Sequence, residues 1–487
     1  MPDWVYFHSM ADIRDYLNWR GDLSFDISPL NEVDGLILSY LSYLEMDDCF
    51  SGETESPEGR KDVPEGEMSG PMPYQKSSFS LPDRVVPLSY AVEQFFRTHT
   101  EKEIAHRRPP FNTVPYVARQ AARTKRFGSL MISDYVNLID DVAEEQMAAM
   151  IFWVDPRTAF ASFRGTDNTI VGWKEDFNLG YLRETPGQRH AVDFLNKVFE
   201  KICAQSKVSS EQFAGDTVGI KDSSRSVPDP GFRIYVGGHS KGGNFAVYGA
   251  AFAGAAVRNR IIRVFANDSP GFRKEIVDHP AYRKLLPKIV SILPDSSIIG
   301  GLLLSESKDI VIASNETGLM QHDALSWQVL GTSFIRAERS DLGRFFDISL
   351  RNWIGSMTDE EMKDFTDALF GMLSAGGART LSELRKDPLR TVSEIFKVSK
   401  NMSPEEFQEF TSVIVRLVKS GLTTFREQSE EKITAVVAGA GTNAQKSRSK
   451  TGGKGRTKSG KPKAKQQAPG TVYLELKKTD PAHETPG

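Results

Sequence analysis

Residues 233–254 read RIYVGGHSKGGNFAVYGAAFAG, and this stretch decides the fold. The β-branched and aromatic run up to Val236 predicts a strand, and the small residues that follow Lys241 predict a helix packed closely on a sheet. Between them lies a G-x-S-x-G pattern. By itself it could be a chance match in a glycine-rich turn, but a nucleophile elbow needs this order of strand, serine and helix. We therefore expect Ser240 to be a nucleophile, with the backbone N–H of Lys241 as an oxyanion donor.

Further apolar runs extend the predicted sheet on both sides of this stretch. They cover residues 147–154, 158–163, 261–266 and 288–293, whereas residues 86–147 have a mainly helical pattern. Strands that alternate with helices imply a mainly parallel sheet covered on both faces. The predicted fold class is therefore α/β, of the α/β-hydrolase type.

Composition divides the rest of the chain. Residues 50–84 and 204–231 are polar and rich in Gly, Pro and Ser, which is typical of a solvated insertion and a surface loop. Helical patterning returns beyond residue 355, where Thr358 with Glu361 predicts a capping box. The expected organisation is a catalytic domain over residues 1–350, a helical C-terminal region over 351–438 and a disordered basic tail over 439–487.

Charge is distributed unevenly along the 487 residues. The net charge is −3, yet residues 446–465 carry nine Lys or Arg and no acid. This tail lacks interleaved aromatic residues, so it predicts only weak, salt-sensitive contact with polyanions. Two cysteines, Cys49 and Cys203, give neither a disulfide framework nor a thiolate metal site. With no signal peptide or membrane-spanning apolar run in view, we expect a cytoplasmic protein that needs no cofactor.

A serine nucleophile needs further groups from elsewhere in the chain. Residues 161–166, ASFRGT, end a predicted strand, and Thr166 could supply a second oxyanion N–H; the simpler interpretation is a structural turn. The histidines after Ser240 are His279, His322 and His483. His322 follows the last predicted strand, at residues 309–313, and is the best candidate for the base, because the other two lie in a charged segment and in the tail.

The acid of the triad stays open on these grounds. Asp268 and Asp295 each follow a predicted strand, and either strand end could place a carboxylate against the imidazole. Chain order alone does not choose between them.

The motifs together resemble a known family. Residues 163–166 (FRGT), 173–176 (WKED) and 238–242 (GHSKG) look like the pattern of class 3, fungal-type lipases. More closely, the chain resembles the Mbeg1-like family of uncharacterised bacterial hydrolase-like proteins, over most of residues 5 to about 340. The stretches that carry this resemblance are 15–22, 31–34, 145–146, 238–244, 268–272, 297–300 and 321–327.

The resemblance implies a lipase-like fold with Ser240, His322, Thr166 and Lys241 in the roles given above. It favours Asp268 as the acid, because an Asp recurs there in the family, although Ser269 departs from the expected Gly. We expect a serine hydrolase that cleaves an ester, with an acyl or lipid group as the candidate substrate. The rival hypothesis is a non-catalytic hydrolase scaffold that acts as a binding or interaction module, since a fold alone does not prove activity.

Overall fold

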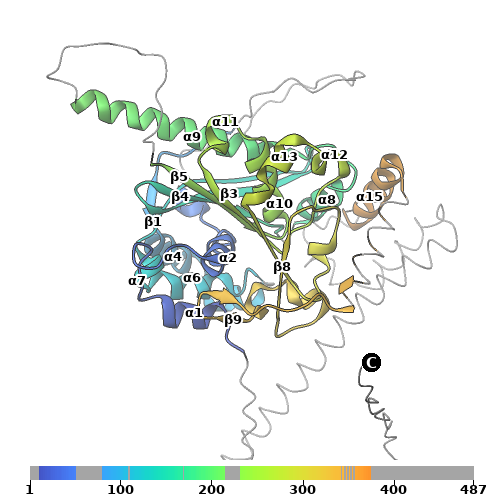
Figure 1. The fold of residues 1–487 in the computed structure, drawn as a ribbon, viewed down its shortest axis with the longest axis horizontal. Coiled ribbons are helices and arrows are strands. Elements are labelled where there is room, and N and C mark those ends of the chain that lie inside the picture. The colour runs from blue at the N-terminus through green and yellow to red at the C-terminus, as the bar shows by residue number, and fades with distance from the viewer. Residues whose placement is uncertain are drawn as a thin grey trace, which may run out of the picture. The chain divides into compact units, whose positions relative to one another are not determined.

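The computed structural model describes residues 10–50, 79–107, 110–167, 169–213, 231–341 and 357–374, with residues 343, 344, 347, 350 and 354 between the last two (Figure 1). Most of the predicted insertion, part of the predicted loop, residues 375–438 of the helical region and the whole basic tail lie outside the described residues. No helix among the described residues is long and apolar enough to cross a membrane.

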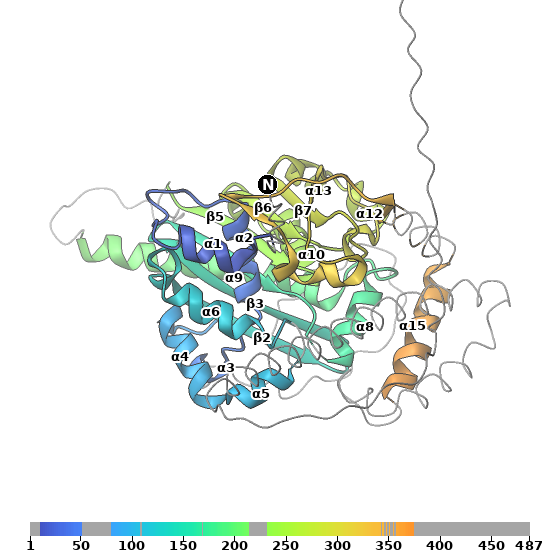
Figure 2. The same cartoon turned by 90° about the horizontal axis from the view of Figure 1, so that it is seen from below.

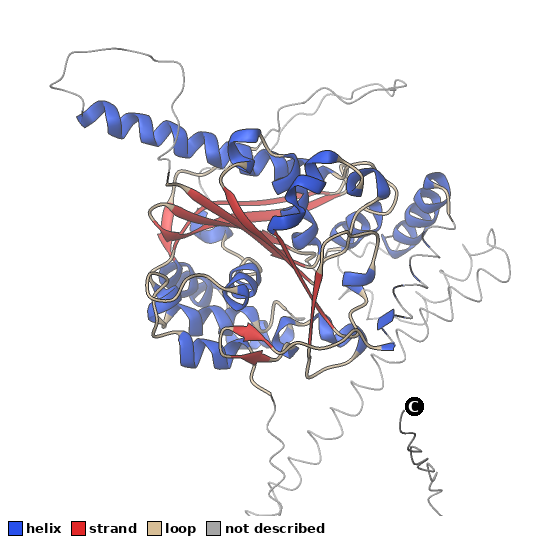
Figure 3. Ribbon diagram, viewed as in Figure 1, coloured by secondary structure: helices blue, strands red, loops and turns tan. Residues whose placement is uncertain are grey.

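One eight-stranded sheet runs through the domain in the spatial order β1 to β8 (Figures 1 and 3). Strands β1 to β4 pair antiparallel, and β4 to β8 pair parallel. Because the parallel strands point the same way, the residues that follow β4, β5, β6 and β7 meet at one edge of the sheet. The strands are β1 Val85–Pro87, β2 Met131–Asp140, β3 Glu145–Asp155, β4 Thr158–Arg164, β5 Arg233–His239, β6 Ile261–Asn267, β7 Ile289–Pro294 and β8 Asp309–Ile312, with a separate β9 Val329–Leu330 and β10 Ser333–Phe334.

Helices cover both faces of this sheet, as Figure 3 shows in blue around the red strands. The helices are α1 Ile13–Arg20, α2 Glu32–Leu41, α3 Asp47–Phe50, α4 Leu88–Thr98, α5 Glu101–His106, α6 Val114–Ala122, α7 Lys125–Gly128, α8 Ile170–Asn178, α9 Pro186–Phe213, α10 Lys241–Phe252, α11 Ala255–Arg258, α12 Lys274–Val277, α13 Pro280–Leu285 and α15 Asp359–Ser374. Short 3₁₀ turns occur at Leu286–Lys288, Ile299–Gly301, Gly318–His322 and Ala324–Ser326.

The two faces have separate apolar cores. On one face, α9 and α10 pack on side chains such as Phe163 and Val236. On the other face, α1, α2, α4 and α6 pack on side chains such as Phe160 and Phe265 (Figure 2). The alternation along β4, where Phe160 and Phe163 serve opposite cores, is that of a strand buried on both sides. The predicted fold class, a mainly parallel sheet with helices on both faces, is confirmed.

The helix α15 is attached to the sheet domain through α8. Its first turn has the predicted capping box, with Thr358 and Glu361 bonded to each other's backbone N–H groups. Phe370 packs edge-on against Phe177 with ring centroids 5.3 Å apart, and Asp367 pairs with Lys174 at 2.6 Å. The beginning of the C-terminal region is thus tied to the helix that follows β4.

Two local predictions hold only in part. Residues 86–147 contain the strands β1 and β2 as well as helices. The strand β2 forms by pairing with β3, and the residue pattern of the segment alone does not reveal this pairing. The predicted loop at 204–231 begins later than expected, since α9 continues to Phe213. At the insertion, the helix α3 ends at Phe50, and the chain is described again from Phe79.

Candidate active site

Ser240 lies in a strained turn between β5 and α10. Its φ of 59° and ψ of −137° are a backbone conformation that residues other than glycine rarely adopt. The glycines beside it are required by close backbone contacts: a Cβ on Gly238 would lie 2.1 Å from the carbonyl oxygen of Gly242, and one on Gly242 would lie 2.2 Å from that of Phe163. The turn therefore has the geometry of a nucleophile elbow.

Asp268 and His322 are joined by a hydrogen bond. Asp268 directly follows β6, is almost fully buried and also has a positive φ, of 44°. The Nδ1 of His322 lies 2.7 Å from one carboxylate oxygen, and the other oxygen accepts from the Ser297 hydroxyl and from the backbone N–H of Gly300 at 3.2 Å. With the proton on Nδ1, the Nε2 of His322 has a free lone pair.

The surroundings of Asp268 keep it ionised. Burial opposes the charge, but the hydrogen bond and charge of His322, together with the Ser297 hydroxyl, lower the pKa of Asp268 below its ordinary value. An ionised carboxylate here holds the imidazole in one tautomer and stabilises the imidazolium when it forms.

The same sheet edge brings Ser240 to this pair. The backbone N–H of Ser240 donates to the carbonyl oxygen of Asn267, the residue before Asp268, at 3.0 Å. The ring of His239, the residue before the serine, contacts the His322 ring in a tilted arrangement with centroids 4.5 Å apart. Three segments far apart in sequence thus meet at this end of the sheet: the turn with Ser240, the residues that follow β6 and the 3₁₀ turn that ends at His322.

Asp295 binds a different partner. It directly follows β7. Its carboxylate accepts from the side-chain amide of Gln321 at 2.6 Å and from the Ser296 hydroxyl at 3.1 Å. Gln321 is the neighbour of His322, so Asp295 supports the segment that carries the imidazole. Of the two candidate acids, the carboxylate bonded to the imidazole is that of Asp268.

The backbone after β4 passes directly beside the serine. A Cβ on Gly165 would lie 2.5 Å from the His239 carbonyl oxygen and 3.0 Å from the Ser240 Cβ. The next residue, Thr166, donates its hydroxyl to Asp176 of α8 at 2.5 Å. Burial raises the pKa of Asp176 to about 6, against the opposing effects of Lys241 and of this hydrogen bond. Thr166 is thus fixed to α8 and directly follows the glycine that lies against the serine.

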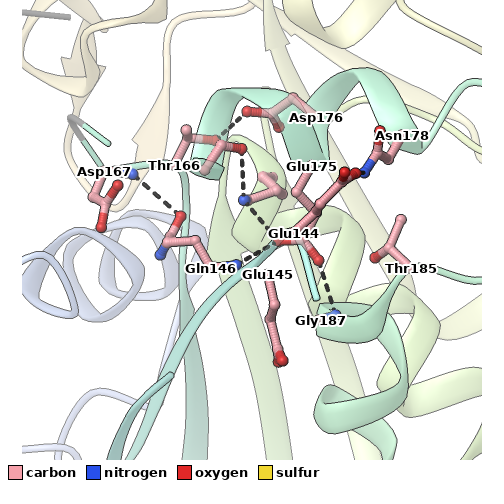
Figure 4. A network of polar contacts seen from close by, with 12 residues as sticks. Glu144, Glu145, Gln146, Thr166, Asp167, Glu175, Asp176, Asn178, Thr185 and Gly187 are labelled. Atoms are coloured by element: carbon pink, nitrogen blue, oxygen red, sulfur yellow. Dashed lines mark hydrogen bonds and ion pairs between the residues drawn. The ribbon is translucent and has the colours of Figure 1, made fainter. Parts of the chain in front are cut away.

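Lys241 directly follows Ser240 in the chain. As the first residue of α10 its N–H has no partner within the helix. Its side chain is fully buried and turns away, with Nζ 3.0 Å from Glu175 and 3.0 Å from the carbonyl oxygen of Gly172. Glu175 also accepts from the backbone N–H of Gln146 at 2.9 Å and of Gly187 at 2.8 Å (Figure 4).

The sequence did not indicate this network. Residues 173–176 belong to the lipase-like motif, but nothing in their pattern assigns Glu175 to Lys241 or Asp176 to Thr166. Ser297 and Gln321 lie in the stretches 297–300 and 321–327 that carry the family resemblance, but the sequence assigns neither residue a role in the site. Among the described residues, no cluster of three or more His, Cys, Asp or Glu side chains could hold a metal ion.

A family model described as Mbeg1-like matches residues 121–371, which is more than half of the chain and includes every candidate site residue. The chain belongs to the Mbeg1-like family. No curated protein matches this Mbeg1-like sequence.

Several solved structures of lipases match the Mbeg1-like chain. The M37 lipase is 14% identical over 42% of this chain and 64% of its own, with a TM-score of 0.28. A Rhizomucor miehei lipase propeptide complex is 16% identical over 40% and 65%, with a TM-score of 0.26. The Lip2 lipase of Yarrowia lipolytica is 14% identical over 45% and 74%, with a TM-score of 0.25. The match thus spans slightly less than two thirds of the first two of these lipases.

Proposed function

We propose that this protein is a serine hydrolase that cleaves an ester through Ser240, His322 and Asp268. The observation that carries the proposal is the Asp268–His322 hydrogen bond beside a serine held at a strained strand-to-helix turn. A bonded carboxylate and imidazole next to a hydroxyl is the arrangement that activates a serine, whose own pKa is too high for it to attack unaided.

In the first half of the reaction, the Oγ of Ser240 attacks the ester carbonyl carbon while the Nε2 of His322 takes the hydroxyl proton. The negative charge on the carbonyl oxygen is stabilised by the backbone N–H groups of Thr166 and Lys241. His322 then gives its proton to the leaving alcohol, and an acyl group remains on Ser240. Asp268 stays ionised and stabilises the imidazolium throughout.

In the second half, water attacks the acyl-enzyme. His322 takes a proton from the water and returns it to the Oγ of Ser240 as the carboxylic acid leaves. Apolar side chains on the segments that carry the site, namely Trp173, Leu304 and Met320, are more than one third exposed and support a substrate with an apolar acyl group.

A fluorophosphonate probe tests the proposal. We expect the full-length protein to gain one covalent adduct, located at Ser240 by mass spectrometry of the digested protein. Ser240→Ala should abolish the adduct, and the matched control Ser305→Ala, at an exposed serine outside the site, should leave it unchanged. Absence of labelling across short- and long-chain probes, or labelling that persists in Ser240→Ala, contradicts the proposal and favours a non-catalytic scaffold.

A further inference from the structure

His239, the residue before the nucleophile, is buried, and each of its two ring nitrogens has a polar partner. It is 3% exposed and ends β5. Its Nε2 lies 2.9 Å from the main-chain carbonyl oxygen of His322, and its Nδ1 lies 3.2 Å from the hydroxyl of Tyr43. None of the steps proposed above uses this side chain.

These partners permit one tautomer of His239. A carbonyl oxygen only accepts hydrogen bonds, so the Nε2 that faces His322 must carry the proton. Nδ1 is then an acceptor that faces the Tyr43 hydroxyl at 3.2 Å, and the main-chain carbonyl oxygen of His239 accepts from the same hydroxyl at 3.3 Å. The arrangement is neutral: burial, and then the charge of His322, lower the pKa of His239 to about 3, and burial raises the pKa of Tyr43 above its ordinary value.

The contact with His322 falls on the main chain of the segment that carries the base. The neighbouring carbonyl oxygen, that of Gln321, accepts from the indole N–H of Trp327 at 2.8 Å. Two consecutive carbonyl groups of the 3₁₀ turn Gly318–His322 are therefore held by buried side-chain donors. The His239 ring also contacts the His322 ring, with the two ring planes tilted by 31°. The position of the imidazole thus depends on His239 as well as on Asp268.

We propose that His239 is a positioning residue which, held in its Nε2–H form by Tyr43, fixes the main chain of His322 and so directs the imidazole at Ser240. Because His239 stays neutral, it does not compete for the proton that His322 takes from the serine. This inference rests on the proposed function, but the state of the His239 ring can be measured without any substrate.

The first test is an NMR titration of the full chain with ¹⁵N-labelled histidine. His239→Gln identifies the signal among the eight histidines of the sequence. We expect an Nε2–H tautomer that does not change between pH 5 and 9. A signal in the Nδ1–H form, or one that titrates near the ordinary histidine pKa, overturns the inference and leaves the proposed hydrolase function untouched.

The second test is the rate of fluorophosphonate labelling in Tyr43→Phe. Losing the one donor to Nδ1 should slow the bond-forming step about tenfold, the effect of about one hydrogen bond, while the affinity for the probe is unchanged. Tyr40→Phe is the matched control, because it also removes a buried tyrosine hydroxyl, which is bonded to Thr113 at 2.7 Å, but leaves the printed hydrogen bonds of His239 in place. We expect it to be labelled at the wild-type rate.

The Tyr43 hydroxyl also lies against Gly165, so the tautomer of His239 should be measured in the Tyr43→Phe protein as well. A shift towards Nδ1–H together with slower labelling supports the inference. Equal rates in Tyr43→Phe and wild type, or equal slowing by Tyr40→Phe, overturn it. A wild-type protein that is not labelled at all contradicts the proposed function instead, whatever the tautomer.

Discussion

The buried ion pair between Lys241 and Glu175 gives a prediction about stability that is independent of any activity. Both side chains are 0% exposed, and their charged atoms are 3.0 Å apart. Lys241→Met keeps most of the aliphatic volume and removes the positive charge. Glu175 would then be a buried carboxylate with only the backbone N–H groups of Gln146 and Gly187 as partners.

The expected cost follows from the loss of one partner. Leaving one charge of a buried pair uncompensated costs about 3–5 kcal/mol. The two remaining N–H donors place Lys241→Met at the lower end, about 3 kcal/mol, or roughly 6 °C in melting temperature. Adding Glu175→Gln removes the uncompensated charge, so the double variant should be about 2 kcal/mol more stable than Lys241→Met alone.

Urea unfolding followed by tryptophan fluorescence measures these differences. Lys274→Met is the matched control, because its partner Asp278 is exposed and surface pairs contribute about 0–1 kcal/mol. A loss below about 1 kcal/mol in Lys241→Met would refute the reasoning. So would a double variant less stable than Lys241→Met, because the cost would then not come from an uncompensated charge.

Four other variants test the site. Asp268→Asn should slow fluorophosphonate labelling about 10³–10⁴-fold, whereas Asp295→Asn should slow it less than about tenfold; the reverse order would make Asp295 the acid. Because the pKa of Asp176 is raised to about 6, the folded state loses stability as the pH rises from about 4 through 6. The free energy of unfolding of Asp176→Asn, measured by urea titration, should therefore increase relative to that of wild type across this range. Gly238→Ala should cost about 3 kcal/mol or more in thermal unfolding, and an unchanged melting temperature would contradict the close contact at the elbow.

The elbow could be predicted because its evidence is local. A strand, a serine between glycines and a small-residue helix follow one another within residues 233–254, and the structure has the same order. The choice between Asp268 and Asp295 could not be predicted from the residues alone, because both follow neighbouring strands at one sheet edge. It depends on which carboxylate the loop before His322 meets, and that loop places Gln321 on Asp295.

The supporting network was hidden for a related reason. Lys241 and Glu175 each look like a charged helix residue that faces water, and their pairing joins positions 66 residues apart. The strand β2 was missed because its backbone partners lie on β3 and its polar residues do not alternate strictly. Information of this kind belongs to tertiary contacts, which a single sequence does not display.

The attachment of α15 to α8 has a practical consequence for anyone who shortens this protein. A fragment that stops before Asp359 would uncover Phe177 and remove one of the two acidic partners of Lys174. That damage would fall on the helix whose Asp176 holds Thr166, so a loss of labelling in such a fragment would not show that the intact protein lacks the proposed activity. Truncations intended to keep the site should end after Ser374.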